Sequence, residues 1–179
     1  MTKPKVFVAR VIPEKGLALV HDFCDADVWP DEMPPSHEEI LRRVRDVDGI
    51  LTLLTEKIDA EVMDAAPRLK VISNMAVGVD NIDVAAATAR HVPVGHTPGV
   101  LTDATADQAF ALLLSAARRI VEADKFLRAG KWKTWSPQLL LGADFVGATL
   151  GIIGFGRIGQ AVAKRAQGFD MHVIYYDPS

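Results

Sequence analysis

Short β-branched runs alternate with helical patterns through the first half of the chain, and this alternation constrains the fold more than any other feature. The runs that predict strands span residues 5–10, 26–29, 49–53, 70–74 and 92–95. Helical patterns span residues 14–22, 38–45, 60–66 and 84–90, and Ser36 and Glu39 have the spacing of a capping box before the second helix. Strands that alternate with helices favour a parallel, doubly wound sheet, so we expect an α/β fold.

The alternation stops at residues 97–99, where the sequence Thr-Pro-Gly indicates a turn. A single helix is predicted over residues 103–129, closed by Gly130 as the C-cap. Its length would be ~40 Å, enough to connect two lobes. Residues 131–146 lack periodicity but contain Trp132 and Trp135, so we expect an apolar loop that packs on another surface.

A second α/β unit is predicted after this loop. Residues 149–153 and 172–176 have strand patterns, and residues 157–167 between them have a helical pattern that Gly168 would end. Two strands and one helix cannot cover both faces of a parallel sheet, so we expect this second domain to be incomplete. The expected divisions are therefore a first α/β unit at 1–98, a connecting helix and loop at 99–146, and an incomplete second α/β unit at 147–179.

The most informative motif lies between that strand and that helix. Residues 154–159 read Gly-Phe-Gly-Arg-Ile-Gly, which matches the dinucleotide-binding pattern G-x-G-x-x-G. Gly154 would permit the tight turn, Gly156 would let a pyrophosphate approach the backbone, and Gly159 would let the helix pack closely on the strand. The amide groups at the helix N-terminus would then bind the anion. A purely structural turn would also favour glycine, but the strand–turn–helix context favours dinucleotide binding.

Asp177 ends the second strand of this unit and lies 177 − 154 = 23 residues after the first glycine. This spacing suits the acidic residue that accepts a hydrogen bond from the adenosine ribose. A carboxylate there would repel a 2′-phosphate, which favours NAD over NADP, although a nearby arginine could still admit NADP. The alternative is that Asp177 and Pro178 simply start a turn.

Composition excludes several classes of function. The formal charge is −3, from 20 basic and 23 acidic residues, and no charge block is present. We therefore expect a small-molecule or protein partner, and neither nucleic acid nor a membrane surface. The longest apolar stretch, 109–117, is too short to span a bilayer. The single cysteine, Cys24, and the absence of an apolar leader at the start favour the cytoplasm.

Four stretches together resemble the family of D-isomer-specific 2-hydroxyacid dehydrogenases. They read NMAVGVDNID at 74–83, TPGVLTDATAD at 97–107, GKW at 130–132 and GIIGFGRIGQA at 151–161. The second stretch is most similar to glyoxylate and hydroxypyruvate reductases. The resemblance implies a flavodoxin-like substrate lobe followed by the beginning of a Rossmann NAD-binding domain. It also implies hydride transfer between NAD(P)H and a small 2-keto acid, which gives the D-2-hydroxy acid.

The resemblance assigns roles to individual residues. Those that would bind substrate are Val77 and Gly78, through their amides to the substrate carboxylate, and Leu53 and Leu54, which would line the pocket. Those that would bind the cofactor are Thr105 near the nicotinamide, Phe155, Arg157 and Ile158 around the pyrophosphate, with Gly154, Gly156, Gly159 and Asp177. Trp132 and Trp135 would contribute to a homodimer contact. The alternatives are structural: a plain turn for Val77 and Gly78, strand core for the leucines, helix capping for Thr105, and core aromatics for the tryptophans.

Two residues depart from the family pattern. His96 stands where asparagine is frequent, which puts the geometry between the lobes in doubt, and Asp170 stands where glycine is frequent. Asp170 can adopt the left-handed conformation at modest cost, so we expect only a small loss of stability there.

The catalytic arginine, glutamate and histidine of the family match no position in this chain, and its five histidines lie outside the catalytic motif. The resemblance therefore implies a fragment that is inactive alone, from a protein that acts on a 2-keto or 2-hydroxy acid. Other readings are an NAD-binding corepressor that acts through protein contacts, a decayed gene product, and a relative of formate dehydrogenase. The short segment before the first strand disfavours the last of these.

Overall fold

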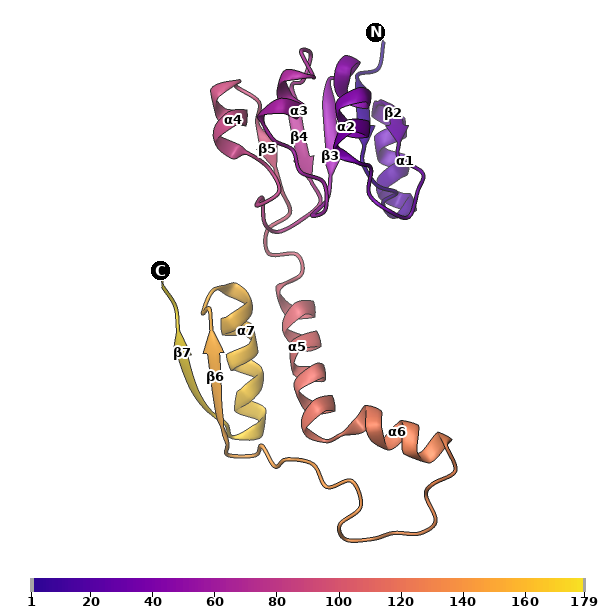
Figure 1. The fold of residues 1–179 in the computed structure, drawn as a ribbon. Helices are drawn as coiled ribbons and strands as arrows, with labels where there is room; N and C mark the ends of the chain where they lie inside the picture. Colours follow the sequence, from indigo (N-terminus) through magenta and orange to yellow (C-terminus); the bar gives the residue numbers. More distant parts are fainter. Residues whose placement is uncertain (1, 179) are drawn as a thin grey trace. The chain divides into compact units, whose positions relative to one another are not determined.

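The computed structural model describes residues 2–178, and the chain divides into two compact units, Met1–Pro98 and Gly99–Ser179. Unit 1 contains five strands, β1 (Lys5–Val8), β2 (Asp25–Val28), β3 (Gly49–Thr52), β4 (Val71–Asn74) and β5 (Val94–Gly95). Its helices are α1 (Glu14–Phe23), α2 (His37–Arg43), the 3₁₀ turn η1 (Val44–Asp46), α3 (Ala60–Asp64) and α4 (Val84–Ala89) (Figure 1).

The five strands form one parallel sheet in the order β2-β1-β3-β4-β5. This is the flavodoxin-like strand order, so the predicted fold class is confirmed for this unit. All nine predicted elements are present, with ends that differ by at most two residues, and α2 begins as predicted with the Ser36 hydroxyl accepting from the Glu39 amide at 3.2 Å.

The core of unit 1 lies between the central strands and the helices. Phe7, Ile50 and Ile72 on three adjacent strands are at most 1% exposed, and they pack with Ile40 of α2 and Val62 of α3. Protein interiors are close-packed. Because α2 and α3 both bury side chains in this core, core packing fixes their positions relative to each other.

Asp48 connects the amino ends of β1 and β3 with the segment before β4. Its carboxylate accepts from the Lys5 amide at 3.0 Å and lies 3.0 Å from Lys70 Nζ and 3.3 Å from Arg68 Nη2. These contacts, led by the hydrogen bond from the Lys5 amide, lower the pKa of Asp48 to about 2. The ionised carboxylate therefore holds three segments together at neutral pH.

Unit 2 contains α5 (Thr102–Ala117), α6 (Ile120–Arg128), β6 (Thr149–Ile153), α7 (Arg157–Ala166), the 3₁₀ turn η2 (Gln167–Phe169) and β7 (His172–Tyr176). Strands β6 and β7 are parallel and in register from Thr149↔His172 to Ile153↔Tyr176, with α7 as the crossover helix. None of the helices in the described residues is long and apolar enough to cross a membrane.

Helices α5 and α7 pack against each other. Ala106 and Ala166 are fully buried, and the rings of Phe110 and Phe169 stack with centroids 5.5 Å apart. Arg165 of α7 adds an ion pair of 2.6 Å with Asp107 of α5. Within unit 2, helix α5 is thus fixed to α7, the helix that follows the glycine-rich turn.

The single helix predicted over 103–129 is wrong, because the structure has two helices. Arg119 separates them and adopts the left-handed conformation, with φ 53°. The Ala117 carbonyl accepts from the Ala143 amide at 2.8 Å, and a Cβ at Gly142 would lie 2.3 Å from that carbonyl oxygen. A distant loop therefore caps α5 and competes with continuation of the helix, and only glycine allows this approach.

The two predicted helix stops also differ in outcome. Gly130 has φ 66°, and hydrogen bonds from Gly130 to Leu127 and from Lys131 to Phe126 form a Schellman motif, as predicted. The stop at Gly168 is wrong, because the left-handed residue after α7 and η2 is Asp170, with φ 53°.

Candidate functional site

The four predicted substrate residues follow two neighbouring strands of unit 1. Leu53 and Leu54 come directly after β3, and Val77 and Gly78 follow β4 by a few residues. The last residues of these strands, Thr52 and Asn74, are paired in register, so both loops leave the sheet at the same edge. Leu54 is 67% exposed, which rules out its alternative reading as strand core.

Glu56 anchors the loop after β3. Its side chain is fully buried and accepts from the Leu53 amide at 2.8 Å, from the Thr52 hydroxyl at 3.0 Å and from the Thr55 hydroxyl at 2.5 Å. Arg10 Nη1 lies 3.8 Å from the same carboxylate. A buried carboxylate with three donors and a neighbouring guanidinium fixes the backbone that carries Leu53 and Leu54.

Two asparagines then connect this loop with the loop after β4. Asn81 Nδ2 donates to the carbonyls of Leu53 at 2.6 Å and Glu56 at 3.0 Å. Asn74 Nδ2 donates to the Gly78 carbonyl at 2.9 Å and to Asn81 Oδ1 at 3.0 Å. Asn74 Oδ1 is buried and accepts no hydrogen bond within the described residues. The two loops are thus held as one polar network.

The network leaves two adjacent amides unused. Among the described residues, the amide groups of Val77 and Gly78 donate no hydrogen bond, whereas the carbonyls of both residues accept one. Both residues are half-buried at the surface. Successive backbone N–H groups with fixed carbonyls form a concavity that suits an anion such as a carboxylate.

His96 and Thr97 support the same loop from the chain segment after β5. His96 Nδ1 lies 2.8 Å from the Val77 carbonyl, and both the amide and the hydroxyl of Thr97 donate to the Ala76 carbonyl, at 2.8 and 3.0 Å. Because a carbonyl can only accept, the His96 contact requires a proton on Nδ1. The histidine that departs from the family pattern therefore takes part in holding the loop that carries Val77 and Gly78.

The glycine-rich turn of unit 2 joins β6 to α7. Gly154 has φ 90°, a conformation that side chains rarely adopt. A Cβ at Gly159 would lie 2.2 Å from the Gly154 carbonyl oxygen, so the strand and the helix could not pack as they do. At Gly156, the N-cap of α7, a Cβ would meet nothing within 4 Å. Two glycines are thus required by the fold, while the third borders open space.

This turn fits a dinucleotide pyrophosphate. Helix α7 has ten residues, no side chain caps its N-terminus, and no acidic residue lies in its first turn. The positive end of the helix dipole and the first amides of α7, at Arg157 and Ile158, therefore face no competing carboxylate from their own turn. The open space beside Gly156 is the position at which the motif requires a ligand to approach the backbone.

Asp177 is tied to this turn by a contact that the sequence pattern did not predict. Its Oδ2 accepts from the Phe155 amide, and the Phe155 ring stacks on Tyr175 of β7 with centroids 4.0 Å apart. The carboxylate at the end of β7 and the glycine-rich turn at the end of β6 therefore lie together, as the 23-residue spacing requires. The pairing also makes Asp177 more than the start of a plain turn.

Thr105 lies in the first turns of α5, half-buried, beside a cavity of about 410 Å³ that this face of α5 lines. Within the described chain, no hydrogen bond joins its hydroxyl to another residue or to the glycine-rich turn. The role assigned to Thr105 near the nicotinamide thus stays a prediction.

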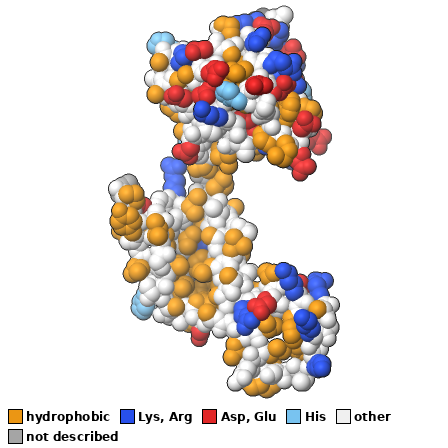
Figure 2. All heavy atoms as spheres, in the orientation of Figure 1, with side chains coloured by type: hydrophobic (Ala, Val, Ile, Leu, Met, Phe, Trp, Pro, Cys, Tyr) orange, Lys and Arg blue, Asp and Glu red, His pale blue; other side chains and the backbone are white. Residues whose placement is uncertain are grey.

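The apolar loop lies against α6 and keeps most of its aromatic surface exposed. Trp132 is 53% exposed and Trp135 is 76% exposed, so the core-aromatic alternative is wrong for both. They border a groove of about 540 Å³, and Figure 2 shows exposed hydrophobic side chains on the surface of the chain. Residues of α6 and of the loop line the groove, among them Phe126, Leu127, Leu139 and Leu140.

Comparison with known proteins gives consistent matches at the level of family, sequence and structure. A family model described as D-isomer specific 2-hydroxyacid dehydrogenase, catalytic domain, matches residues 6–171. The glyoxylate reductases of Korarchaeum cryptofilum and Thermococcus kodakarensis are 57% and 54% identical over 98% and 99% of this chain. The crystal structure of the TT0316 protein from Thermus thermophilus is 48% identical, covers 98% of this chain and 56% of its own, and has a TM-score of 0.92. The chain spans about half the length of the two curated relatives, 53% and 54%.

Proposed function

This chain belongs to the family of D-isomer specific 2-hydroxyacid dehydrogenases, and on that premise we propose that it supplies two binding elements of a glyoxylate reductase-like oxidoreductase. One element holds the carboxylate of a small 2-keto acid, and the other holds the pyrophosphate of a nicotinamide dinucleotide. The observation that carries the proposal is the turn at 154–159, where a Cβ at Gly159 would collide with the Gly154 carbonyl while Gly156 borders open space.

The carboxylate-binding element consists of the Val77 and Gly78 amides. Neither amide donates to an acceptor within the described residues, and the carbonyls that share their peptide planes, those of Ala76 and Val77, are held by Thr97 and His96. Two oriented amides without an acceptor support this role. Leu53 and Leu54 would border the carbon chain of the acid. The substrate would be a short acid such as glyoxylate or hydroxypyruvate, and the names of the two relatives give glyoxylate.

The cofactor element consists of Gly154, Gly156 and Gly159, with Phe155, Arg157 and Ile158 around the phosphates and Asp177 at the ribose. When bound, the nicotinamide would supply or accept the hydride. The Asp177 carboxylate would accept from a ribose hydroxyl and repel a 2′-phosphate, so NAD is proposed over NADP. The amides that begin α7 would orient the pyrophosphate, and Thr105 would lie near the nicotinamide ring.

The proposed substrate and cofactor elements include, among the described residues, no cation to clamp a carboxylate beside Val77 and Gly78 and no acid to protonate a carbonyl oxygen. Arg10, which reaches this loop network, is bound to Glu56 and to the Glu32 carbonyl. His96 points its Nδ1 at the Val77 carbonyl. We therefore propose that the 179 residues alone bind the ligands and do not turn them over.

We also propose that the complete protein is a homodimer in which Trp132 and Trp135 contribute to the contact. Two tryptophans that are more than half exposed beside an apolar groove support an interface, because such patches on a surface are usually covered.

The carboxylate-binding element can be tested by nuclear magnetic resonance, with the isotope-labelled chain titrated with glyoxylate. We expect amide shift changes at Val77 and Gly78, because these N–H groups would take on a charged acceptor. Acetamide, which lacks the carboxylate, serves as the matched control and should leave both amides unchanged. Shifts spread over the surface, or absent at these two residues, would contradict the assignment.

Titration with NADH tests the cofactor element independently. Gly156→Ala should keep the folded spectrum, since its Cβ meets no atom within 4 Å, yet weaken NADH binding about tenfold or more by blocking the approach to the backbone. Asp177→Asn should narrow the preference for NADH over NADPH. If Gly156→Ala and the unsubstituted chain bound NADH with equal affinity, the assignment of the cofactor element would be refuted. Steady NADH oxidation in the presence of glyoxylate would refute the proposed inactivity of the chain.

A further inference from the structure

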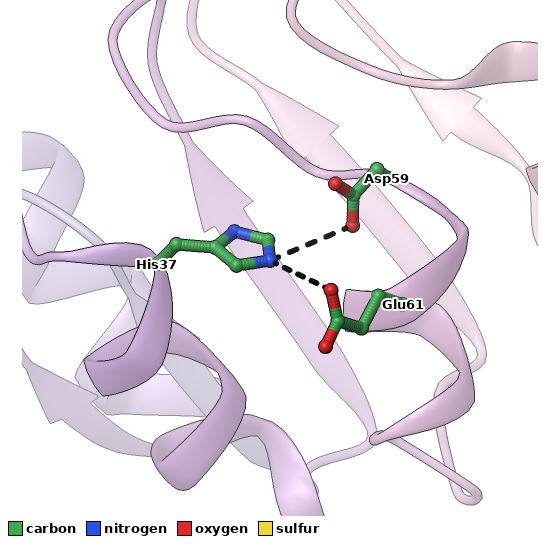
Figure 3. A group of neighbouring side chains, drawn as sticks. All are labelled: His37, Asp59 and Glu61. Carbon is green, nitrogen blue, oxygen red and sulfur yellow. Dashed lines mark hydrogen bonds and ion pairs between the residues drawn. The ribbon is translucent and has the colours of Figure 1, made fainter.

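A second polar cluster lies in unit 1, outside the loops already described. His37 Nε2 is 3.4 Å from Glu61 Oε2 and 3.9 Å from Asp59 Oδ1, and the donor atoms of the three side chains all lie within 4.8 Å of one another. In Figure 3 the imidazole of His37 points into the space between the two carboxylates. The cluster thus presents one nitrogen and two oxygens to a common point.

The three side chains stand on elements whose positions are fixed by the core. His37 begins α2, Asp59 is the N-cap of α3 and accepts from the Val62 amide at 3.2 Å, and Glu61 lies in the first turn of α3. Ile40 of α2 and Val62 of α3 are buried in the same hydrophobic cluster. Core packing therefore sets the separation of the two helix starts that carry these three side chains.

The distances are long for direct hydrogen bonds and match a shared cation. His37 Nε2 forms a hydrogen bond of 3.4 Å with Glu61 Oε2 and lies 3.9 Å from Asp59 Oδ1, whereas most N–H···O hydrogen bonds are about 2.9 Å long. Bonds of about 2.0–2.1 Å from zinc to nitrogen and oxygen place neighbouring tetrahedral ligands about 3.4 Å apart. The His37–Glu61 distance of 3.4 Å has this value. The Glu61 side chain is 71% exposed, so a small rotation of it could adjust the distance between the Glu61 and Asp59 oxygens.

We propose that His37, Asp59 and Glu61 form a binding site for a divalent transition-metal ion of the zinc class, completed by water. One imidazole with two carboxylates disfavours Mg²⁺ and Ca²⁺ as occupants, because these ions take oxygen ligands. Three protein ligands and an open position are a common arrangement for zinc. The site is separate from the substrate and cofactor elements, so it stands or falls independently of the proposed function.

Lys57 and the Val62 amide bind different oxygens of Asp59. Lys57 Nζ contacts Oδ2 at 2.9 Å, whereas Oδ1, the oxygen that faces His37, accepts from the Val62 amide at 3.2 Å and would use a second lone pair for a metal. The same lysine would compete with a metal for Asp59, so its removal should strengthen binding.

Calorimetric titration of the chain with ZnCl₂ tests the site. We expect one ion per chain, binding weakened about tenfold or more in His37→Asn and Glu61→Gln, and tighter binding in Lys57→Met. Asp59→Asn keeps the N-cap hydrogen bond but removes the charged ligand, so it should weaken zinc binding while the far-ultraviolet circular dichroism stays unchanged. The matched control is His21→Asn, which removes an exposed histidine on α1 and should leave the affinity unchanged.

Co²⁺ provides a second measurement that does not depend on the variants. Its paramagnetism should broaden and shift the ring protons of His37 at stoichiometric metal, and those of His21 only at large excess. Zinc binding that survives in His37→Asn, or Co²⁺ effects spread equally over the histidines, would overturn the proposal. In that case the three residues form only a surface ion-pair cluster.

Discussion

Replacement of Glu56 by leucine should destabilise unit 1 by about 3 kcal/mol. Two effects oppose each other in this change. The leucine avoids the cost of burying a carboxylate, and whole buried ion pairs can be replaced by apolar groups at little cost. Here only one partner is removed, however, and the donors that Glu56 satisfies stay in place. The loss of partners should therefore outweigh the gain from desolvation.

The magnitude follows from the three donors and Arg10. Hydrogen bonds to charged groups contribute about 1.5–3 kcal/mol each, and an unsatisfied buried amide costs about 1–3 kcal/mol. The Leu53 amide, bonded at 2.8 Å, has no other acceptor, while the exposed Thr55 hydroxyl and the Arg10 side chain, 25% exposed, can turn to water. The main loss is thus at Leu53. Glu56→Gln retains an oxygen acceptor there and should cost only about 1 kcal/mol.

Urea unfolding followed by circular dichroism measures the effect. With an m value of about 2 kcal/mol/M, a loss of about 3 kcal/mol lowers the midpoint by about 1.5 M. Hydrogen exchange of the Leu53 amide gives a local readout and should accelerate in Glu56→Leu. Glu32→Gln, an exposed substitution in the same unit, is the matched control and should stay within about 0.5 kcal/mol. A leucine variant as stable as this control would show that Glu56 is no anchor.

Three further outcomes are expected. Gly159→Ala should destabilise unit 2 by about 3 kcal/mol, because its Cβ would lie 2.2 Å from a backbone carbonyl, whereas Gly168→Ala, which meets nothing within 4 Å, should change the melting temperature little. Asp48 has a folded pKa of about 2 against an ordinary 3.8, so its contribution to stability is present above pH 3.8 and is lost as the pH falls towards 2. Asp48→Asn should therefore show a lower urea midpoint at pH 7 and a smaller decline between about pH 4 and 2. Asp170→Gly should raise the stability of unit 2 by about 0.5–1 kcal/mol, measured by the same unfolding, because Asp170 holds φ 53°.

Local patterns were sufficient to predict the sheet and most helices. Period-two runs and helical periodicity are properties of short segments, so β6 and β7 were predicted with the bounds that the structure gives. The break between α5 and α6 was not predictable in this way, because it depends on Gly142, which is distant in sequence from the Ala117 carbonyl that it approaches. The predicted stop at Gly168 failed for a different reason: glycine is only the commonest left-handed residue, and Asp170, which the sequence marked as able to adopt this conformation, adopts it after η2.

The candidate site was predictable where backbone geometry demands a residue type. The roles of Gly154 and Gly159 follow from a positive φ and a close approach, and the motif encodes both. The supporting residues Glu56, Asn74 and Asn81 gave no such signal, because a buried acid or amide looks like a surface residue in sequence. Only the fold shows that Asn81 bridges to Leu53 and Glu56. An acid shortly after a buried strand and an asparagine in the following loop are the one pattern that could have suggested them.

The polar network explains how a loop with two bare amides can persist beside the sheet. An amide pair binds a carboxylate well only if it does not have to be ordered by the ligand, since ordering costs free energy at the moment of binding. The Ala76 carbonyl is held by Thr97, and the Val77 carbonyl by His96. In a trans peptide the carbonyl of one residue points opposite to the amide of the next, so the Val77 and Gly78 amides are both oriented before any ligand arrives. His96→Ala should accordingly weaken glyoxylate binding without unfolding unit 1, whereas His96→Asn, which can donate to the same carbonyl, should weaken it less.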